Sequence, residues 1–243
     1  MPDRRNKWLP REPSPEATGR VFLIPYSGCG ASMYRRWPRR HGGVDLLPVE
    51  LPGHETRLAE PNFRTYQELA EQMAVGLAPH LDRPYAFFGH CGSALAAYEV
   101  SAEITRAGLP EPTRLYVSSQ VSPQDGPTGR FLEMDDAELA EELTGLSREL
   151  GAEPIPDLID FYVEVLRADV ETNKRYVVPD PFRLRCSITA IGWTEDVEVR
   201  HDTMGGWTAC GDTTFRLLAG RHYRFIDAPL ELLDLLCGDL DRS

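Results

Sequence analysis

Six short apolar runs along the chain predict the strands of one buried sheet. They are "RVFLIPY" (20–26), "VDLLPVEL" (44–51), "YAFFGH" (85–90), "RLYVSS" (114–119), "LRCSITAIGW" (184–193) and "TFRLLAG" (214–220). Runs that are apolar at successive positions are typical of strands covered on both faces, as in parallel sheets. We therefore expect a mostly parallel sheet with helices on both sides.

Helical patterns fall between several of these runs. In 65–81, four apolar residues recur every four positions on one face: Leu69, Met73, Leu77 and Leu81. A second helix should begin directly after Cys91, run to about Arg106 and end at Gly108. Strands that alternate with helices in this way predict a doubly wound α/β fold.

The segment 122–181 interrupts the alternation because it contains no convincing strand. It opens in the turn-rich "SPQDGPTGR" and continues with two helical stretches, "DDAELAEELTGLSREL" and "PDLIDFYVEVLRADVETNKRY". One helix is enough for an ordinary crossover. We interpret 122–181 as a helical lid inserted between 19–121 and 182–243, which form the core. The alternative is a pair of extra surface helices away from any site.

Composition fits one globular domain and excludes several classes of partner. The chain has 243 residues, 42% of them hydrophobic, and its net charge of −12 argues against binding nucleic acid or an anionic membrane surface. No apolar segment approaches the ~20 residues that span a bilayer, and the N-terminus lacks the apolar core of a signal peptide. We expect a cytoplasmic monomer. Residues 1–18, rich in Arg, Pro and Glu, predict an arm or a disordered tail.

The cysteines indicate neither disulfides nor a metal site. There are five of them, at positions 29, 91, 186, 210 and 237, and none forms a C-x-x-C pair. An odd number without close pairing is unlike a disulfide framework or a structural zinc site. We therefore expect no metal and no cofactor.

The segment "YAFFGHCGSALAAYEV" (85–100) joins a predicted strand to a predicted helix through a turn centred on Cys91. The nucleophile of α/β-hydrolases stands in such a turn, in the pattern G-x-S-x-G, where small neighbours let the strained backbone close. Gly89 and Gly92 are small, but Ser93 replaces the last glycine of the pattern. The flanking strand and helix favour a nucleophile at Cys91 over a small buried hydrophobic residue.

Two further residues follow predicted strands in the chain order that α/β-hydrolases use. Asp196 comes just after the strand at 184–193, and His222 comes just after the strand at 214–220. The order nucleophile, acid, histidine predicts a catalytic triad. Glu195 and Glu198 remain alternatives for the acid, and an exposed loop histidine remains the alternative for His222.

An oxyanion hole needs two backbone N–H donors near the nucleophile. We expect one from Gly92 and the other from Ser27, in the glycine-bearing loop "IPYSGCGASMYRRW" after the first strand. Cys29 lies in this loop, and a passive small residue is favoured over redox coupling to Cys91. The other histidines (41, 54, 80, 90 and 201) are interpreted as structural or solvated, with His90 beside the nucleophile.

Jointly, these segments resemble the type II thioesterases of nonribosomal peptide and polyketide assembly lines, which are stand-alone α/β-hydrolases. "IPYSGCGASMYRRW" is similar to the family's F-P-x-x-G-G loop and "VELPGHETRLAEP" to its Q-L-P-G-R-x-x-R-x-x-E-P segment. "LDRPYAFFGHCGSALAAYE" is similar to its D-R-P-x-x-x-F-G-H-S-M-G-A-L-x-x-(F/Y)-E elbow. "GLPEPTRLYVSSQVSP", "LRADVETNKRY" and "AGRHYRF" continue the resemblance, which covers roughly 20–240.

The resemblance implies a Cys91, Asp196, His222 triad, an oxyanion hole from Ser27 and Gly92, and a helical lid over an acyl channel. It also implies an acyl or peptidyl carrier protein as partner, with the substrate held on phosphopantetheine. The chain departs from the family at the chemistry, with cysteine for serine, "CGS" for "SMG" and "GRHY" for "GGHF".

Three functions remain open at this point. The first is a thioesterase that releases acyl chains by hydrolysis through an acyl-enzyme on Cys91. The second is an acyltransferase or cyclase that passes the acyl group from Cys91 to a thiol, amine or hydroxyl. The third is a binding protein that has lost activity. Fold is inherited more safely than reaction, so the departures do not affect the expected α/β-hydrolase fold.

Overall fold

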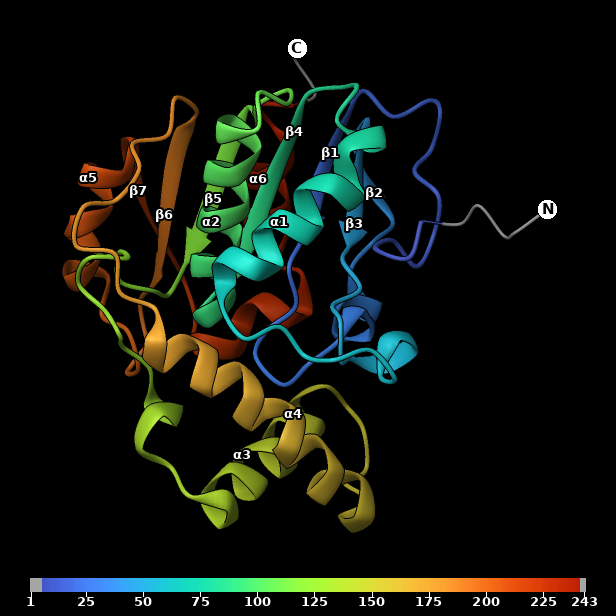
Figure 1. Cartoon of the computed structure of the whole chain (residues 1–243), viewed down its shortest axis with the longest axis vertical. Coiled ribbons are helices and arrows are strands. Elements are labelled where there is room, and N and C mark those ends of the chain that lie inside the picture. The colour runs from blue at the N-terminus through green and yellow to red at the C-terminus, as the bar shows by residue number, and fades with distance from the viewer. Residues whose placement is uncertain (1–5, 241–243) are drawn as a thin grey trace.

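The computed structural model describes residues 6–240, and within them seven strands form one sheet in the order β2-β3-β1-β4-β5-β6-β7 (Figure 1). The parallel strands are β1 (Gly19–Leu23), β3 (Val44–Pro48), β4 (Tyr85–His90), β5 (Arg114–Ser118), β6 (Ser187–Trp193) and β7 (Asp212–Leu218). The prediction of a mostly parallel sheet is confirmed. The two-residue strand β2 (Arg40–His41), antiparallel to β3, was not predicted.

The strand β7 differs from the prediction of a strand buried on both faces. It lies at the edge of the sheet, and the side chains of Phe215 and Leu217 are nearly half exposed. A strand at the edge of a sheet can have the same apolar pattern as a central strand, so the sequence did not show that β7 lies at the edge.

Helices cover both faces of the sheet. On one face α1 (Tyr66–Leu77) and α2 (Gly92–Arg106) pack on alternate strand residues such as Phe22 and Phe87, while α6 (Leu230–Cys237) packs on the other face against Val21 and Phe88 (Figure 1). Both predicted core helices are therefore confirmed. The short helices are α5 (Trp207–Cys210), η1 (Ala31–Arg36), η2 (Glu55–Arg57), η3 (Ala78–His80), η4 (Arg130–Glu133), η5 (His201–Gly206) and η6 (His222–Asp227).

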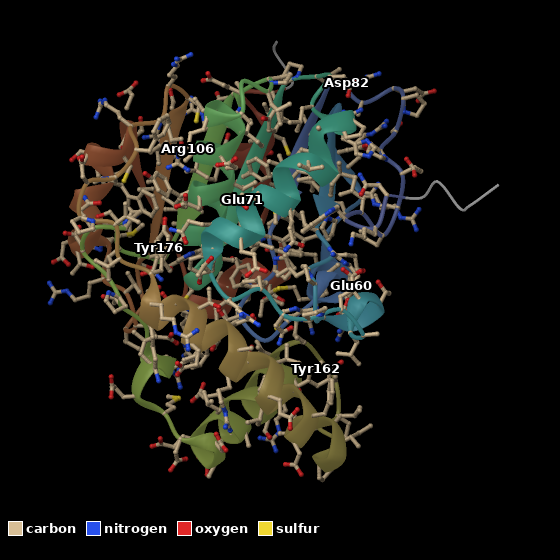
Figure 2. The ribbon with its side chains drawn as sticks, viewed as in Figure 1. Glu60, Glu71, Asp82, Arg106, Tyr162 and Tyr176 are labelled. Carbon is tan, nitrogen blue, oxygen red and sulfur yellow. The ribbon has the colours of Figure 1, made fainter. Side chains whose placement is uncertain are left out.

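The segment 122–181 contains two long helices, α3 (Asp136–Glu149) and α4 (Pro156–Arg175), at the edge of the sheet toward which the β5 arrow points (Figure 1). Their apolar side chains belong to the same buried cluster as Cys91. The end of α4 nearest the sheet is fixed by Tyr176, whose hydroxyl donates to Glu99 Oε2 at 2.6 Å. Figure 2 shows Tyr162 further along α4, away from this anchor.

Of the two alternatives for the N-terminus, an arm or a disordered tail, the packing of residues 6–18 on the core fits the arm. Trp8 is only 3% exposed, its ring lies against Gly76 of α1, and the Arg57 guanidinium lies 4.3 Å from the ring centroid. The Trp8 carbonyl accepts a hydrogen bond from Glu50 N at 2.8 Å. The burial of Trp8 therefore fixes the arm on the core, although most residues of the arm are polar. Residues 1–5 lie outside the described part of the chain.

We expect Trp8→Ala to lower the free energy of unfolding by about 3–5 kcal/mol, because a buried aromatic side chain is lost and a cavity is left. The measurement is equilibrium urea unfolding. Leu230→Ala is the control, since Leu230 is 65% exposed and its truncation should change stability by about 0.5 kcal/mol or less. Equal losses in the two variants would show that the arm contributes little to the core.

Candidate active site

The turn between β4 and α2 forms the predicted elbow. Cys91 stands at its centre with φ = 55° and ψ = −132°, a backbone conformation that non-glycine residues rarely adopt. Cys91 N donates to Ser118 O at 2.8 Å, and Ala94 N donates to Cys91 O at 2.9 Å. Gly89 is required here, because a Cβ at this position would lie 2.3 Å from the Ser93 carbonyl oxygen.

Ser93, which replaces the usual glycine of the elbow, uses its hydroxyl within the backbone. Its Oγ accepts from His90 N at 2.9 Å and lies 3.0 Å from His90 O and 3.3 Å from Ile24 O. The hydroxyl therefore stabilises the turn, and these contacts leave it poorly placed to act as a nucleophile.

The structure brings His222 and Asp196 together as predicted. His222 Nδ1 lies 2.9 Å from Asp196 Oδ2, although 26 residues separate them in the chain. Asp196 Oδ2 also accepts from Ser119 Oγ at 2.6 Å, while Oδ1 accepts from the backbone of Glu198 at 2.9 Å and of Val199 at 3.1 Å. The carboxylate is thus fixed on both oxygens. The role of Ser119 was not recognised from the sequence, where its only signal is its place directly after β5.

The two alternative acids lie elsewhere around the histidine. Glu195 is exposed and pairs with Arg221 at 3.7 Å. Glu198 approaches the opposite ring nitrogen, with its Oε2 3.4 Å from His222 Nε2. Asp196 therefore holds Nδ1, and Glu198 has a position that the sequence analysis did not anticipate.

Neighbouring charges and hydrogen bonds determine the protonation states of His222 and Asp196. Burial alone would lower the pKa of His222, but the hydrogen bond to Asp196 and the nearby Cys91 thiol outweigh it and raise that pKa to about 10. Burial alone would raise the pKa of Asp196, yet its hydrogen bonds to His222 and Ser119 hold it well below the usual range. At neutral pH the site therefore contains an imidazolium beside an ionised carboxylate.

His90 flanks the elbow and stays neutral. Its Nδ1 lies 2.9 Å from Ser118 Oγ, its ring stacks on Phe225 at a centroid distance of 4.1 Å, and the ring of His222 is 4.5 Å away. Burial and the neighbouring His222 move the pKa of His90 well below its ordinary value. A neutral ring at this place supports the orientation of His222 without competing for its proton.

The loop after β1 brings Ser27, the predicted second N–H donor, next to the elbow. A Cβ on Gly92 would lie 2.9 Å from Ser27 Oγ, so Ser27 and Gly92 are neighbours. The next residue, Gly28, has φ = +74°, and a Cβ there would meet Leu166 of α4 at 2.9 Å. The loop and α4 are therefore in direct contact.

A buried carboxylate ties this loop to α4. Asp169 Oδ2 accepts from Gly28 N at 2.8 Å and lies 3.1 Å from His54 Nε2, while His54 Nδ1 lies 2.9 Å from Pro52 O. Burial would lower the pKa of His54, but Asp169 raises it above its usual value. His54 was interpreted as structural and Asp169 was not singled out. The sequence offered one indication of these two residues. Both lie in segments, "ELPGHETR" and "LRADVETNKRY", that resemble segments of the type II thioesterases.

A cavity of about 190 Å³ lies between the loop and the two insertion helices. Its lining includes Cys29 and Met33 on the loop side and Leu146, Ile159 and Tyr162 on the helix side. Burial and the carboxylates of Asp169 and Glu55 raise the pKa of the Cys29 thiol to about 12, so this thiol is not ionised at neutral pH. Because thiolates are the reactive form, this favours a passive role for Cys29.

Residues 6–240 contain no group of three or more His, Cys, Asp or Glu side chains arranged to hold a metal ion. Across the same residues, no helix has the length and apolar character needed to cross a membrane.

Comparisons with known proteins show the family to which this chain belongs. The family model of the thioesterase domain matches residues 19–239. The gramicidin S biosynthesis protein GrsT of Aneurinibacillus migulanus is 27% identical, over 97% of this chain and 94% of that protein. The structure of RedJ, a thioesterase from the prodiginine pathway of Streptomyces coelicolor, superposes with a TM-score of 0.78 at 30% identity, covering 97% of this chain and 94% of RedJ. BorB, the type II thioesterase of the borrelidin cluster, gives a TM-score of 0.79 at 27% identity, covering 96% and 97%. This chain, with its α/β-hydrolase fold, therefore belongs to the thioesterase family.

Proposed function

We propose that this protein is a type II thioesterase that acts on acyl groups carried as phosphopantetheine thioesters in nonribosomal peptide or polyketide synthesis. The observation that carries the proposal is the 2.9 Å hydrogen bond between His222 and Asp196 beside the Cys91 elbow. The names of RedJ, BorB and GrsT connect them with the biosynthesis of prodiginine, borrelidin and gramicidin S, and this supports the choice of substrate. Cys91 is the nucleophile, His222 moves the proton, and Asp196 orients the imidazole.

In the acylation step Cys91 gives its proton to His222 Nε2, and Cys91 Sγ attacks the thioester carbonyl and forms the new S–C bond. The bond from that carbon to the phosphopantetheine sulfur breaks, and the leaving sulfur takes the proton from His222 Nε2. The backbone N–H groups of Gly92 and Ser27 bind the oxyanion of the tetrahedral intermediate. The high pKa of His222 suits this step, because it favours the proton of Cys91 on the imidazole, from which the leaving sulfur takes it.

In the hydrolytic step neutral His222 takes a proton from water as the oxygen attacks the acyl carbon. The C–S bond to Cys91 then breaks, and the products are a free acid and the regenerated thiol. Acylation leaves His222 neutral, and the imidazole can act as the base until it takes up another proton. Acylation and hydrolysis therefore need opposite protonation states of one residue.

The helical insertion acts as the lid in this proposal. Its apolar face joins the cluster that contains Cys91, and the cavity beside Cys29 offers apolar space for part of an acyl group. A carrier-bound thioester has to enter between the lid and the loop while bulk water is kept out. A carrier protein that binds at α3 and α4 is the partner that this geometry favours.

Transfer to another acceptor is the second candidate function, and Cys91 itself favours it. Exchange between phosphopantetheine and Cys91 converts one thioester into another of similar energy, so the acyl group stays activated. A serine ester would be lower in energy and would resist thiols and amines. Cysteine thus suits transfer, although catalytic cysteines in hydrolases show that water is also an acceptor.

One experiment tests the proposed function and separates the two candidates. A loaded carrier protein is offered with and without a second carrier or an amine, and the released product is identified by mass. We expect free acid without an acceptor, and we expect Cys91→Ser to lower transfer more than hydrolysis, shifting the product ratio toward free acid. Wild type that yields only free acid with every acceptor would exclude transfer. Wild type that yields neither product would leave only an inactive binding protein.

A further inference from the structure

A second carboxylate lies beside His222, on the side opposite Asp196. Glu198 Oε2 is 3.4 Å from His222 Nε2, and the Glu198 side chain is only 9% exposed. Among residues 6–240 this oxygen has no hydrogen-bond partner. A buried carboxylate oxygen without a partner is costly unless a positive charge compensates it. The protonated Nε2 of His222 is the group that lies within reach.

The other oxygen of Glu198 is fixed by the helical insertion. Glu198 Oε1 lies 2.9 Å from Arg130 Nη1 in η4, and the second terminal amine of Arg130 pairs with Glu142 of α3. One guanidinium is thus shared by two carboxylates, and the three side chains together carry a net charge of −1. Arg130 therefore holds Glu198 in place without cancelling the negative charge beside the imidazole.

The remaining groups around Nε2 carry little fixed charge. The rings of Tyr26 and Tyr223 lie 6.1 Å and 5.2 Å from the imidazole, and burial raises the pKa of both phenols, which keeps them neutral. His90 is neutral for the reason given above. Cys91 is the reacting group itself, and Asp196 acts on the other nitrogen. Glu198 is therefore the fixed negative charge on this side.

We propose that Glu198 is a positioning residue that pairs with Nε2 of His222, keeps the imidazole protonated in the resting site and restrains it from activating water. The assignment of steps rests on the proposed function, in which His222 Nε2 moves the proton. Glu198 touches the histidine and acts through it.

The consequence differs between acceptors. For water, His222 has to be neutral, because it must remove a proton while the O–C bond forms and the S–C bond to Cys91 breaks. A thiol acceptor that arrives as a thiolate needs no base, because its sulfur forms the new S–C bond directly and Cys91 departs as a thiolate. Glu198 therefore lengthens the lifetime of the acyl-enzyme toward water more than toward thiols.

The first test measures His222 without any substrate. Protein labelled with ¹³C and ¹⁵N in histidine is titrated by NMR between pH 6 and 11, and the His222 signal is assigned from the spectrum of His222→Gln. We expect Glu198→Gln to lower the midpoint of His222 by about one pH unit, since a charge within 4–6 Å is removed. Glu198→Asp, which keeps the charge on a shorter side chain, should fall between the two.

Glu195→Gln is the matched control, because it removes an exposed carboxylate three positions earlier in the chain. Its screened charge should move the midpoint by about 0.3 units or less. An unchanged midpoint in Glu198→Gln, or an equal fall in Glu195→Gln, would overturn the pairing. This measurement does not require that Cys91 be acylated, so it stands even if the proposed function fails.

The second test uses the acyl-enzyme. At pH 7 we expect Glu198→Gln to hydrolyse it faster than wild type, by up to about tenfold, because one unit in the pKa of His222 in the acyl-enzyme changes its neutral fraction by at most about ten. Thiol transfer should change less. Slower or unchanged hydrolysis, together with a lowered midpoint, would show that Glu198 sets the charge of His222 but does not restrain water.

Discussion

Replacing Cys91 by alanine is expected to abolish the acyl-enzyme and to lower turnover of a loaded carrier protein on the order of 10⁴-fold or more. In the proposed mechanism Cys91 Sγ forms the covalent bond to the acyl group. Without it, the proposed oxyanion donors should support only a small part of the rate. Intact-mass analysis after incubation with an acyl-phosphopantetheine thioester measures the adduct, and steady-state kinetics measures the rate.

Cys29→Ala is the matched control for this result, because Cys29 lies in the neighbouring loop and its thiol is not ionised at neutral pH. The adduct should persist in this variant. An adduct in Cys91→Ala that is absent from Cys29→Ala would move the nucleophile to the loop. Ser93 is a poor substitute in either case, since its hydroxyl is hydrogen-bonded to the backbone of the turn.

Removing the imidazole in His222→Ala should cost on the order of 10³-fold in kcat/KM, because the group that protonates the leaving sulfur is lost. Asp196→Asn should cost less, about 10²-fold or below, since a cysteine thiol ionises more readily than a serine hydroxyl and depends less on an oriented base. Glu195→Gln should be close to wild type. A loss in Glu195→Gln with normal activity in Asp196→Asn would reassign the acid.

The same variants predict a pH dependence with a definite sign. The pKa of His222 is raised to about 10, so the imidazolium is present below that pH and is lost as pH rises through it. Acylation needs the imidazolium, and its rate should therefore fall above about pH 10 in wild type. In Asp196→Asn the fall should begin at lower pH, because the main group that raises the pKa is gone. A fall at the same pH in both proteins would contradict the assignment.

The sequence predicted those parts of the fold that depend on local pattern. The six apolar runs and the four-residue spacing in 65–81 identify strands and a helix, because burial on a sheet or on one helical face imposes those periods. The two residues of β2 are polar and only partly buried, so no pattern indicates them. The packing of Trp8 depends on Gly76, nearly seventy residues away, and composition alone indicates only a polar arm.

The candidate site divides in the same way. The place of Cys91 in the elbow could be predicted because the elbow is a local strand-turn-helix motif, and Asp196 and His222 could be singled out because each follows a strand. The distinction between Asp196 and Glu198 depends on the course of a loop, which brings one carboxylate to Nδ1 and the other to Nε2. The contacts of Asp169 join residues more than a hundred positions apart, and no spacing rule predicts them.

The hydrogen bond from Gly28 to Asp169 couples the order of the loop after β1 to the position of α4. Displacing α4 breaks two hydrogen bonds to one carboxylate oxygen and frees the loop that carries Ser27. By linkage, any ligand that binds the ordered loop more tightly than the disordered loop favours the docked position of α4 by the same free energy. A partner that pulls α4 away therefore weakens, by that amount, the binding of any ligand that needs the ordered loop beside the elbow.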